Sequence, residues 1–469
     1  MTLATLAGLL NGIAFIFWGP AALVANVPLL YVLHQAASRR RAALLGGWVG
    51  LLGGMHIYGI LDYGWLLFVG FSVYTASQMV LYALLHRTLR GRFGPVFDVV
   101  LPALIWTLTE WIRTIGPLAM PASYVGCMAD IPWLHPWLWL APWIGGLGVS
   151  SLIALSQSVI YHTLARRPTH GRAVLIWGGV VAAAGVFGGL NPPDLGDRVV
   201  RVVGVQGGLA NAQYRAAQAD ALAQRDIVRT YEVLTQQAYA RHPDLVVWPE
   251  TAVRTDVLNT PAMRARFAPP PGSSATLVAG LLHREGTQAW NLAAALGPGG
   301  TVLGRYVKVR TVPRTEAYLT RGTDRRPLVT PAGAIGVLIC LESVYPDAGR
   351  ETVRRGAELL TILSNDAGFG RSPITAHMTR RAIVQAVENG RWLMRVGQAG
   401  ITTLIDPRGD THGALGLFEP ALLEGEARLR RDLTPATRWG DFWMVLCGLP
   451  LLATLGLRVG RARGAARRR

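Results

Sequence analysis

Three apolar runs of this sequence lead into side chains that could do chemistry. Leu245–Trp248 precedes Pro249 and Glu250, Gly336–Ile339 precedes Cys340, and Leu359–Leu363 precedes Ser364-Asn365-Asp366. Proline cannot continue a strand ladder, so the first run ends where the carboxylate begins. Functional groups of open α/β sheets gather at the carboxyl ends of strands. A carboxylate and a thiol delivered to one edge could therefore form a base–nucleophile pair.

A single lysine adds to this pattern. Lys308 is the only lysine among 46 Lys and Arg residues. A position that needs only positive charge would be arginine in this chain, so Lys308 is expected where a guanidinium would not serve. A compact ammonium can approach a tetrahedral oxyanion, whereas a planar guanidinium does so poorly. Taken singly, Cys340 could equally be a buried apolar residue, Glu250 a first-turn helix residue and Lys308 a solvated surface charge.

The composition places part of the chain in lipid. The 469 residues have a mean hydropathy of +0.30 and are only 16% charged, which excludes a disordered or nucleic-acid-coating chain despite a net charge of +18. The three cysteines and ten histidines show no metal-ligand spacing, and no phosphate- or dinucleotide-binding glycine loop is present. Neither a disulfide framework nor a metal or cofactor is expected.

Apolar runs close to the roughly 20 residues that cross a bilayer predict seven transmembrane helices in residues 1–190. They lie near 3–19, 21–37, 42–60, 64–86, 97–116, 138–164 and 173–190; an eighth is expected in 438–459, before an Arg-rich tail, 460–469. Arginines follow the even-numbered spans, which predicts cytoplasmic termini and an external segment between spans seven and eight. Glu110 and Arg113, in or near the fifth span, form a buried pair or contact lipid headgroups.

The external segment, residues 198–431, is expected to form an α/β domain. Short apolar runs typical of buried strands lie at 199–205, 245–248, 275–282, 335–339 and 359–363. Helical patterns cover 211–241 and the stretch from Pro373 to Glu388, which Asn389-Gly390 ends. The alternation of strands and helices predicts a layered α/β sandwich.

The ordered motifs resemble the Glu–Lys–Cys signature of the nitrilase, or carbon–nitrogen hydrolase, superfamily. The matching segments are Trp248-Pro249-Glu250, the stretch from Tyr306 through Lys308 to Glu316, Ile339-Cys340-Leu341-Glu342 and Ser364-Asn365-Asp366-Ala367. With seven preceding spans and one following span, nearly the whole chain resembles the apolipoprotein N-acyltransferase family. Residues 102–113 are also similar to the membrane part of that family.

This resemblance implies a multi-pass helical membrane domain and a nitrilase-like α-β-β-α sandwich outside the bacterial cytoplasmic (inner) membrane, in a monomer. It implies transfer of a fatty acyl chain from a phospholipid to the N-terminal amine of a diacylglyceryl-cysteine lipoprotein. Cys340 would carry the acyl group as a thioester, and Glu250 would take and return protons. Lys308, with a backbone N–H after Cys340, would hold the oxyanion. No cofactor or nucleic acid is implied.

Further residues follow from the same resemblance. Glu316 and Glu342 would orient Lys308 and the cysteine turn, or are surface carboxylates. Asn365, Phe369 and Tyr306 are candidates for the substrate pocket.

Three positions depart from the family pattern. Leu341 replaces an aromatic residue, Gly368 stands where the family has tryptophan, and Gln398-Ala399-Gly400 replaces Asn-Asn-Gly. Because such positions shape the lipid and acceptor pocket more than the bond chemistry, thioester formation is more firmly implied than the acceptor. The alternatives are a related acyltransferase with another amine acceptor, a membrane-tethered amidase acting on a small external amide, and a catalytically silent lipid-binding scaffold.

Overall fold

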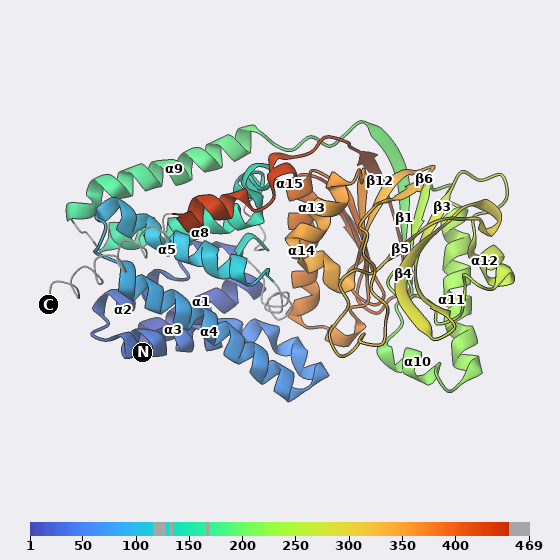
Figure 1. Ribbon diagram of the computed structural model, residues 1–469, viewed down its shortest axis with the longest axis horizontal. Coiled ribbons are helices and arrows are strands. Elements are labelled where there is room, and N and C mark those ends of the chain that lie inside the picture. Colours follow the sequence, from blue (N-terminus) through green and yellow to red (C-terminus); the bar gives the residue numbers. More distant parts are fainter. Residues whose placement is uncertain (116–127, 131–134, 166–167, 450–469) are drawn as a thin grey trace, which may run out of the picture. The chain divides into compact units, whose positions relative to one another are not determined.

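The computed structural model describes residues 1–115, 128–130, 135–165 and 168–449, which form two compact units (Figure 1). One unit comprises Met1–Pro192 and Trp439–Arg469, and the other comprises Pro193–Arg438. The first is helical and the second is an α/β fold. Cys127, Arg166, Arg167 and the Arg-rich tail lie outside the described residues.

Among the described residues, five helices are long and apolar enough to cross a membrane. The first, Arg39–Leu61, joins α3 (Arg39–Gly53) to most of η2 (Gly54–Tyr63), and the others are α4 (Trp65–Leu89), α5 (Pro95–Ile112), α8 (Ala141–Leu164) and α9 (Gly171–Leu190). They correspond to predicted spans three to seven. Three short helical segments lie between these long helices: η4 (Met128–Asp130), α7 (His135–Leu138) and η5 (Pro168–His170).

The first two predicted spans form shorter helices than the five above, and whether they cross the membrane stays a prediction. They are α1 (Thr2–Ile16), η1 (Gly19–Leu23) and α2 (Val27–Gln35). Pro20 and Pro28 lie in the first turns of η1 and α2, where a residue without an N–H is tolerated, so each starts a new helix. The eighth predicted span is helical at 442–449 and then passes outside the described residues.

The two charged residues at the end of α5 form a buried pair. Arg113 Nη2 lies 3.4 Å from Glu110 Oε1, and the residues are 7% and 1% exposed. The same oxygen accepts hydrogen bonds from Trp106 Nε1 at 2.8 Å and the Met128 backbone N at 3.0 Å. Of the two interpretations of this pair, the structure supports internal pairing within the helical unit.

Residues 193–438, all of them described, contain two six-stranded sheets. One sheet has the order β12-β1-β2-β3-β4-β5 and the other the order β11-β10-β9-β8-β7-β6. Strands β1, β2 and β3 are parallel neighbours, as are β7, β8 and β9. The strands are β1 (Arg198–Gln206), β2 (Leu245–Val247), β3 (Thr276–Glu285), β4 (Gln288–Leu296), β5 (Val302–Val307), β6 (Leu328–Thr330), β7 (Gly333–Ile339), β8 (Leu359–Ser364), β9 (Leu393–Gly397), β10 (Thr403–Ile405), β11 (Thr411–Ala414) and β12 (Ala421–Leu429).

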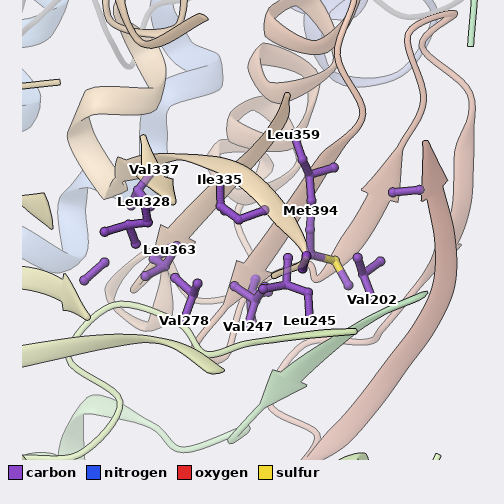
Figure 2. Close-up of a cluster of buried hydrophobic side chains, with 14 of the residues drawn as sticks. Val202, Leu245, Val247, Val278, Leu328, Ile335, Val337, Leu359, Leu363 and Met394 are labelled. Atoms are coloured by element: carbon purple, nitrogen blue, oxygen red, sulfur yellow. The ribbon is translucent and has the colours of Figure 1, made fainter. Parts of the chain in front are cut away.

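The two sheets pack face to face around an apolar core. Val247 and Val278 of the first sheet meet side chains such as Ile335 and Met394 of the second (Figure 2). Helices cover the outer faces, with α11 on the first sheet and α13 and α14 on the second, so the layers are α-β-β-α. The helices and short turns are α10 (Asn211–Ala216), α11 (Ala221–Tyr239), α12 (Pro261–Phe267), η6 (Pro298–Gly300), η7 (Cys340–Val344), α13 (Pro346–Arg354), η8 (Ala367–Phe369), α14 (Pro373–Asn389) and α15 (Pro435–Trp439).

The structure divides one predicted helix and adds several strands. The helix expected over 211–241 is two helices, because α10 ends at Ala216 and Asp220 caps a new start by accepting a hydrogen bond from Leu222 N at 2.8 Å. The alanine-rich strand β4 was not predicted. Alanine is depleted in strands, and β4 is stabilised by its neighbours β3 and β5.

Candidate active site

Glu250 lies in the turn that follows β2. The turn fits closely over β3, where a Cβ on Gly280 would lie 2.2 Å from the Pro249 carbonyl oxygen. Only glycine allows the backbone to approach so closely. Thr251, in the same turn, has a φ of 45° in the left-handed region. The resulting turn holds Glu250 at 5% exposure, at the carboxyl end of a parallel strand as predicted.

Lys308 follows β5 and is 1% exposed. Its Nζ donates hydrogen bonds to Glu250 Oε1 at 2.7 Å and to Glu316 Oε1 at 3.0 Å. Asn291 Nδ2 donates to the same two oxygens, each at 2.8 Å. An ammonium has three donors, so these contacts among the described residues use two and leave one for another acceptor.

Glu250 has hydrogen-bonding capacity to spare on its second oxygen. Oε1 accepts from both Lys308 and Asn291, whereas Oε2 accepts one hydrogen bond, from the Asn365 backbone N at 3.2 Å. A carboxylate oxygen can accept two hydrogen bonds. Within the described part of the chain, Oε2 therefore retains a position that can receive a proton.

Cys340 is the first residue after β7 and opens the turn η7. Its φ of 47° lies in the left-handed region, which a residue with a Cβ adopts at a cost. The side chain is partly exposed, unlike the buried strand residues before it. Cys340 also packs against the core between the sheets. The expectation that one sheet edge delivers both the carboxylate and the thiol was wrong, because Glu250 follows a strand of the first sheet and Cys340 a strand of the second, facing sheet.

Glu342 joins the cysteine turn to the end of β5. Its Oε2 accepts a hydrogen bond from Ile339 N at 2.9 Å, and its Oε1 accepts from the backbone N atoms of Val309 and Arg310 at 2.9 and 3.2 Å. The carboxylate is fully buried, and Arg325 Nη1 at 3.2 Å balances its charge. The Glu342 side chain thereby holds the backbone after Lys308 and the backbone before Cys340 in fixed positions.

The charges around the site determine its resting protonation state. Burial acts to lower the pKa of Lys308, but Glu250, Cys340 and Glu316 outweigh burial and hold this pKa above its usual range. Burial raises the pKa of the Cys340 thiol well above its usual range. Glu250 raises the thiol pKa further, and Lys308 opposes that rise. At neutral pH the site therefore combines an ammonium with a neutral thiol.

The three pocket candidates have different surroundings. The Asn365 backbone contacts Glu250, and its side-chain oxygen accepts a hydrogen bond from Ala367 N at 3.3 Å. Phe369 is buried at the end of η8. The Tyr306 hydroxyl donates to Glu342 at 2.9 Å, and its ring packs in the core between the sheets. That these residues line a substrate pocket stays a prediction.

Sequence reasoning did not identify Asn291, Arg325 or Arg395. Asn291 was detectable in principle, because it is the polar exception in the apolar run from Asn291 to Leu296. Arg325 and Arg395 resemble dozens of other arginines in this chain, so no sequence signal separates them. Within the described residues, no group of three or more His, Cys, Asp or Glu could hold a metal ion.

Comparisons with known proteins place this chain in a family. Residues 7–159 match the apolipoprotein N-acyltransferase N-terminal domain, and residues 208–431 match carbon-nitrogen hydrolase. The apolipoprotein N-acyltransferase of Azotobacter vinelandii is 32% identical over 504 residues, covering 96% of this chain and 93% of that protein. The chain belongs to the apolipoprotein N-acyltransferase family. It is therefore an enzyme, with the helical and nitrilase-like domains of that family.

Two further similarities accompany this family membership. The apolipoprotein N-acyltransferase of Geobacter metallireducens is 29% identical over 503 residues, covering 97% of this chain and 95% of that protein. Among solved structures, a carbon-nitrogen hydrolase from Helicobacter pylori G27 matches 52% of this chain and 94% of its own, with 18% identity and a TM-score of 0.40.

Two of the three departures from the family pattern lie in buried positions, and Gly368 is partly exposed. Leu341 is buried in the turn after Cys340, and the Gln398 side chain accepts a hydrogen bond from the Tyr231 hydroxyl. Gly368 lies within η8, between Ala367 and Phe369.

Proposed function

We propose that the protein transfers a fatty acyl chain from a phospholipid to the N-terminal amine of a diacylglyceryl-cysteine lipoprotein, through a thioester on Cys340. The observation that supports this most directly is the Lys308 ammonium, which is bound to two carboxylates after a strand of the first sheet and interacts with Cys340, which follows a strand of the second sheet. The roles of base, oxyanion donor and nucleophile belong to Glu250, Lys308 and Cys340.

The first half-reaction forms the thioester. Glu250 Oε2 accepts the thiol proton as the Cys340 sulfur attacks the ester carbonyl carbon of the phospholipid. The carbonyl oxygen gains the negative charge and accepts the third N–H of Lys308 together with a backbone N–H after Cys340. The C–O ester bond then breaks, and Glu250 returns the proton to the departing lysophospholipid. Each donor to the oxyanion lowers the barrier by about 3 kcal/mol.

The second half-reaction uses the same groups in reverse order. The acceptor amine attacks the thioester carbon, and Glu250 takes a proton from its nitrogen. The C–S bond breaks, the amide forms, and the thiol of Cys340 regains the proton. Glu316 and Asn291 hold Lys308 and Glu250 in register, and Glu342 holds the cysteine turn.

An assay with both substrates tests this proposal. Purified enzyme should move a labelled acyl chain from phospholipid to a diacylglyceryl-cysteine peptide. The product should be an amide that resists neutral hydroxylamine, with one lysophospholipid released per transfer. If the label instead appears as free fatty acid, or another amine is acylated in preference, the acceptor assignment is wrong. Hydrolysis of a small amide in place of transfer would identify an amidase.

We also propose that residues 191–437 lie outside the cytoplasmic membrane and both chain termini lie inside. The support is the distribution of arginines, which follow the even-numbered predicted spans. Reporter fusions after Gly189 and after Arg469 should therefore report opposite sides of the membrane. The control is a fusion after Arg92, which should report the same side as the C-terminal fusion. Reporters at 189 and 469 on one side would contradict this topology.

A further inference from the structure

A buried ion pair lies beside the candidate active site without taking part in the proposed bond chemistry. Arg395 on β9 contacts Asp366, which follows β8, and both side chains are 1% exposed. Asp366 Oδ1 also accepts a hydrogen bond from Ser364 Oγ at 2.6 Å, and Arg395 Nη1 donates to the Ile401 carbonyl at 2.6 Å. The pair therefore joins the ends of two neighbouring parallel strands.

The loop at Gly400 passes close to this ion pair. A Cβ on Gly400 would lie 2.4 Å from Asp366 Oδ2, so glycine is required where the next loop passes the carboxylate. Removing either Asp366 or Arg395 would leave the other as an uncompensated buried charge, which is strongly unfavourable.

The loop that Asp366 anchors contacts the proposed base. Asn365, its neighbour in sequence, donates its backbone N–H to Glu250 Oε2 at 3.2 Å. The Asp366 carbonyl accepts a hydrogen bond from Phe369 N at 2.9 Å, which starts the turn η8. The position of the Glu250 oxygen that receives the thiol proton thus depends on where Asp366 is held.

We infer that the Asp366–Arg395 pair is a positioning device that fixes the 364–369 loop against Glu250 and keeps the charge facing Cys340 in balance. This inference rests on the proposed roles of Glu250 and Cys340. Neither Asp366 nor Arg395 needs to touch substrate for it to hold.

Several ionisable groups surround the thiol of Cys340. The ionisable groups facing Cys340 from neighbouring elements are Glu250 after β2, Lys308 and Glu316 after β5, and Asp366 after β8, while Glu342 lies on its own turn. Asp366 disfavours the thiolate, and Arg395 neutralises Asp366 at close range. Removing the negative member should therefore favour the thiolate, and removing the positive member should disfavour it.

Alkylation of Cys340 by iodoacetamide measures this balance. The full-length protein in detergent, with Cys127 and Cys447 changed to serine, would be alkylated at pH 8. A charge added or removed near Cys340 should move the pKa of its thiol by about one unit, which changes the thiolate fraction about tenfold. A thiolate of lower pKa is also a weaker nucleophile, so the alkylation rate should change by only about threefold. Asp366→Asn should be alkylated about threefold faster, and Arg395→Gln about threefold slower.

Three further variants separate charge from folding. Arg395→Lys keeps the charge and should remain near the wild-type rate, and the double variant Asp366→Asn/Arg395→Gln should return to it. Glu388→Gln breaks another buried pair of this unit, with Arg350 at 3.0 Å, and should leave alkylation unchanged. In acyl transfer, Asp366→Asn should lose about tenfold to a hundredfold in kcat with KM for phospholipid unchanged, because the base is displaced.

The outcomes distinguish this inference from the function it rests on. Opposite shifts in the two single variants, cancelled in the double variant, support it. Shifts in the same direction, or no shift, while Cys340→Ala is inactive, would overturn the positioning role alone. Retention of acyl transfer by Cys340→Ala would overturn the proposed function and this inference with it.

Discussion

Replacing Lys308 with arginine is expected to reduce acyl transfer to a small residual fraction without unfolding the protein. The positive charge is retained, but the position is almost fully buried and its Nζ already bonds two carboxylates. A larger, planar guanidinium cannot keep both bonds and still direct one donor at the oxyanion. Turnover at a saturating phospholipid concentration, with thermal unfolding measured in parallel, checks this expectation.

The reverse exchange at a nearby arginine provides a matched control. Arg305 lies on β5, three positions before Lys308, is exposed, and lies 3.6 Å from Glu285. Arg305→Lys should leave turnover unchanged, since a surface ion pair contributes little. If Lys308→Arg keeps more than about a tenth of wild-type activity, a barrier change of only about 1.4 kcal/mol, the argument from the single lysine is wrong.

The second large effect concerns the covalent intermediate. Enzyme incubated with acyl-labelled phospholipid and no acceptor should retain one acyl chain that neutral hydroxylamine removes, and Cys340→Ala should retain none. Cys340→Ser should also fail. The resting thiol is already held neutral by burial and by Glu250, and an alcohol is a far weaker acid still. A carboxylate base could not activate it.

The other two cysteines are the internal control for this experiment. Serine at Cys127 and Cys447 should leave labelling intact, because neither belongs to the nitrilase-like unit. Labelling that survives Cys340→Ala would place the acyl group elsewhere. Absence of label in the wild-type protein, with free fatty acid released, would mean that water intercepts the thioester and that the site is hydrolytic.

The sequence contained enough information to predict that Glu250 and Cys340 follow the ends of strands, and their catalytic roles stay a prediction. Glu250 and Cys340 each follow a short apolar run ended by an abrupt change of residue type, and that local signal corresponds to the ends of β2 and β7. Lys308 follows no such run and was detectable by its rarity and by the motif around it. Asn291 and the Asp366–Arg395 pair depend on contacts between strands, and such contacts leave no local trace in residue type.

The fold was predictable where one pattern dominated. Strands buried on both faces produce uninterrupted apolar runs, and β7 and β8 were recognised this way. The alanine-rich β4 and the mostly exposed β11 carry no such run, and their pairing partners determine them. Hydropathy alone also did not predict the division of the first two spans into α1, η1 and α2, because it does not register that a proline starts a new helix at Pro20 and Pro28.

Because Lys308 is the only lysine, cleavage after it can measure local opening of the candidate active site. A protease that cleaves only after lysine has one substrate bond in this sequence, Lys308–Val309. The lysine is buried, and Glu342 holds the backbone N–H groups of Val309 and Arg310, so cleavage requires this segment to detach from the cysteine turn. When detachment and reclosure are fast relative to cleavage, the yield of two fragments measures the population of the open form. Digestion in detergent, with and without added phospholipid, would then show whether lipid closes the site.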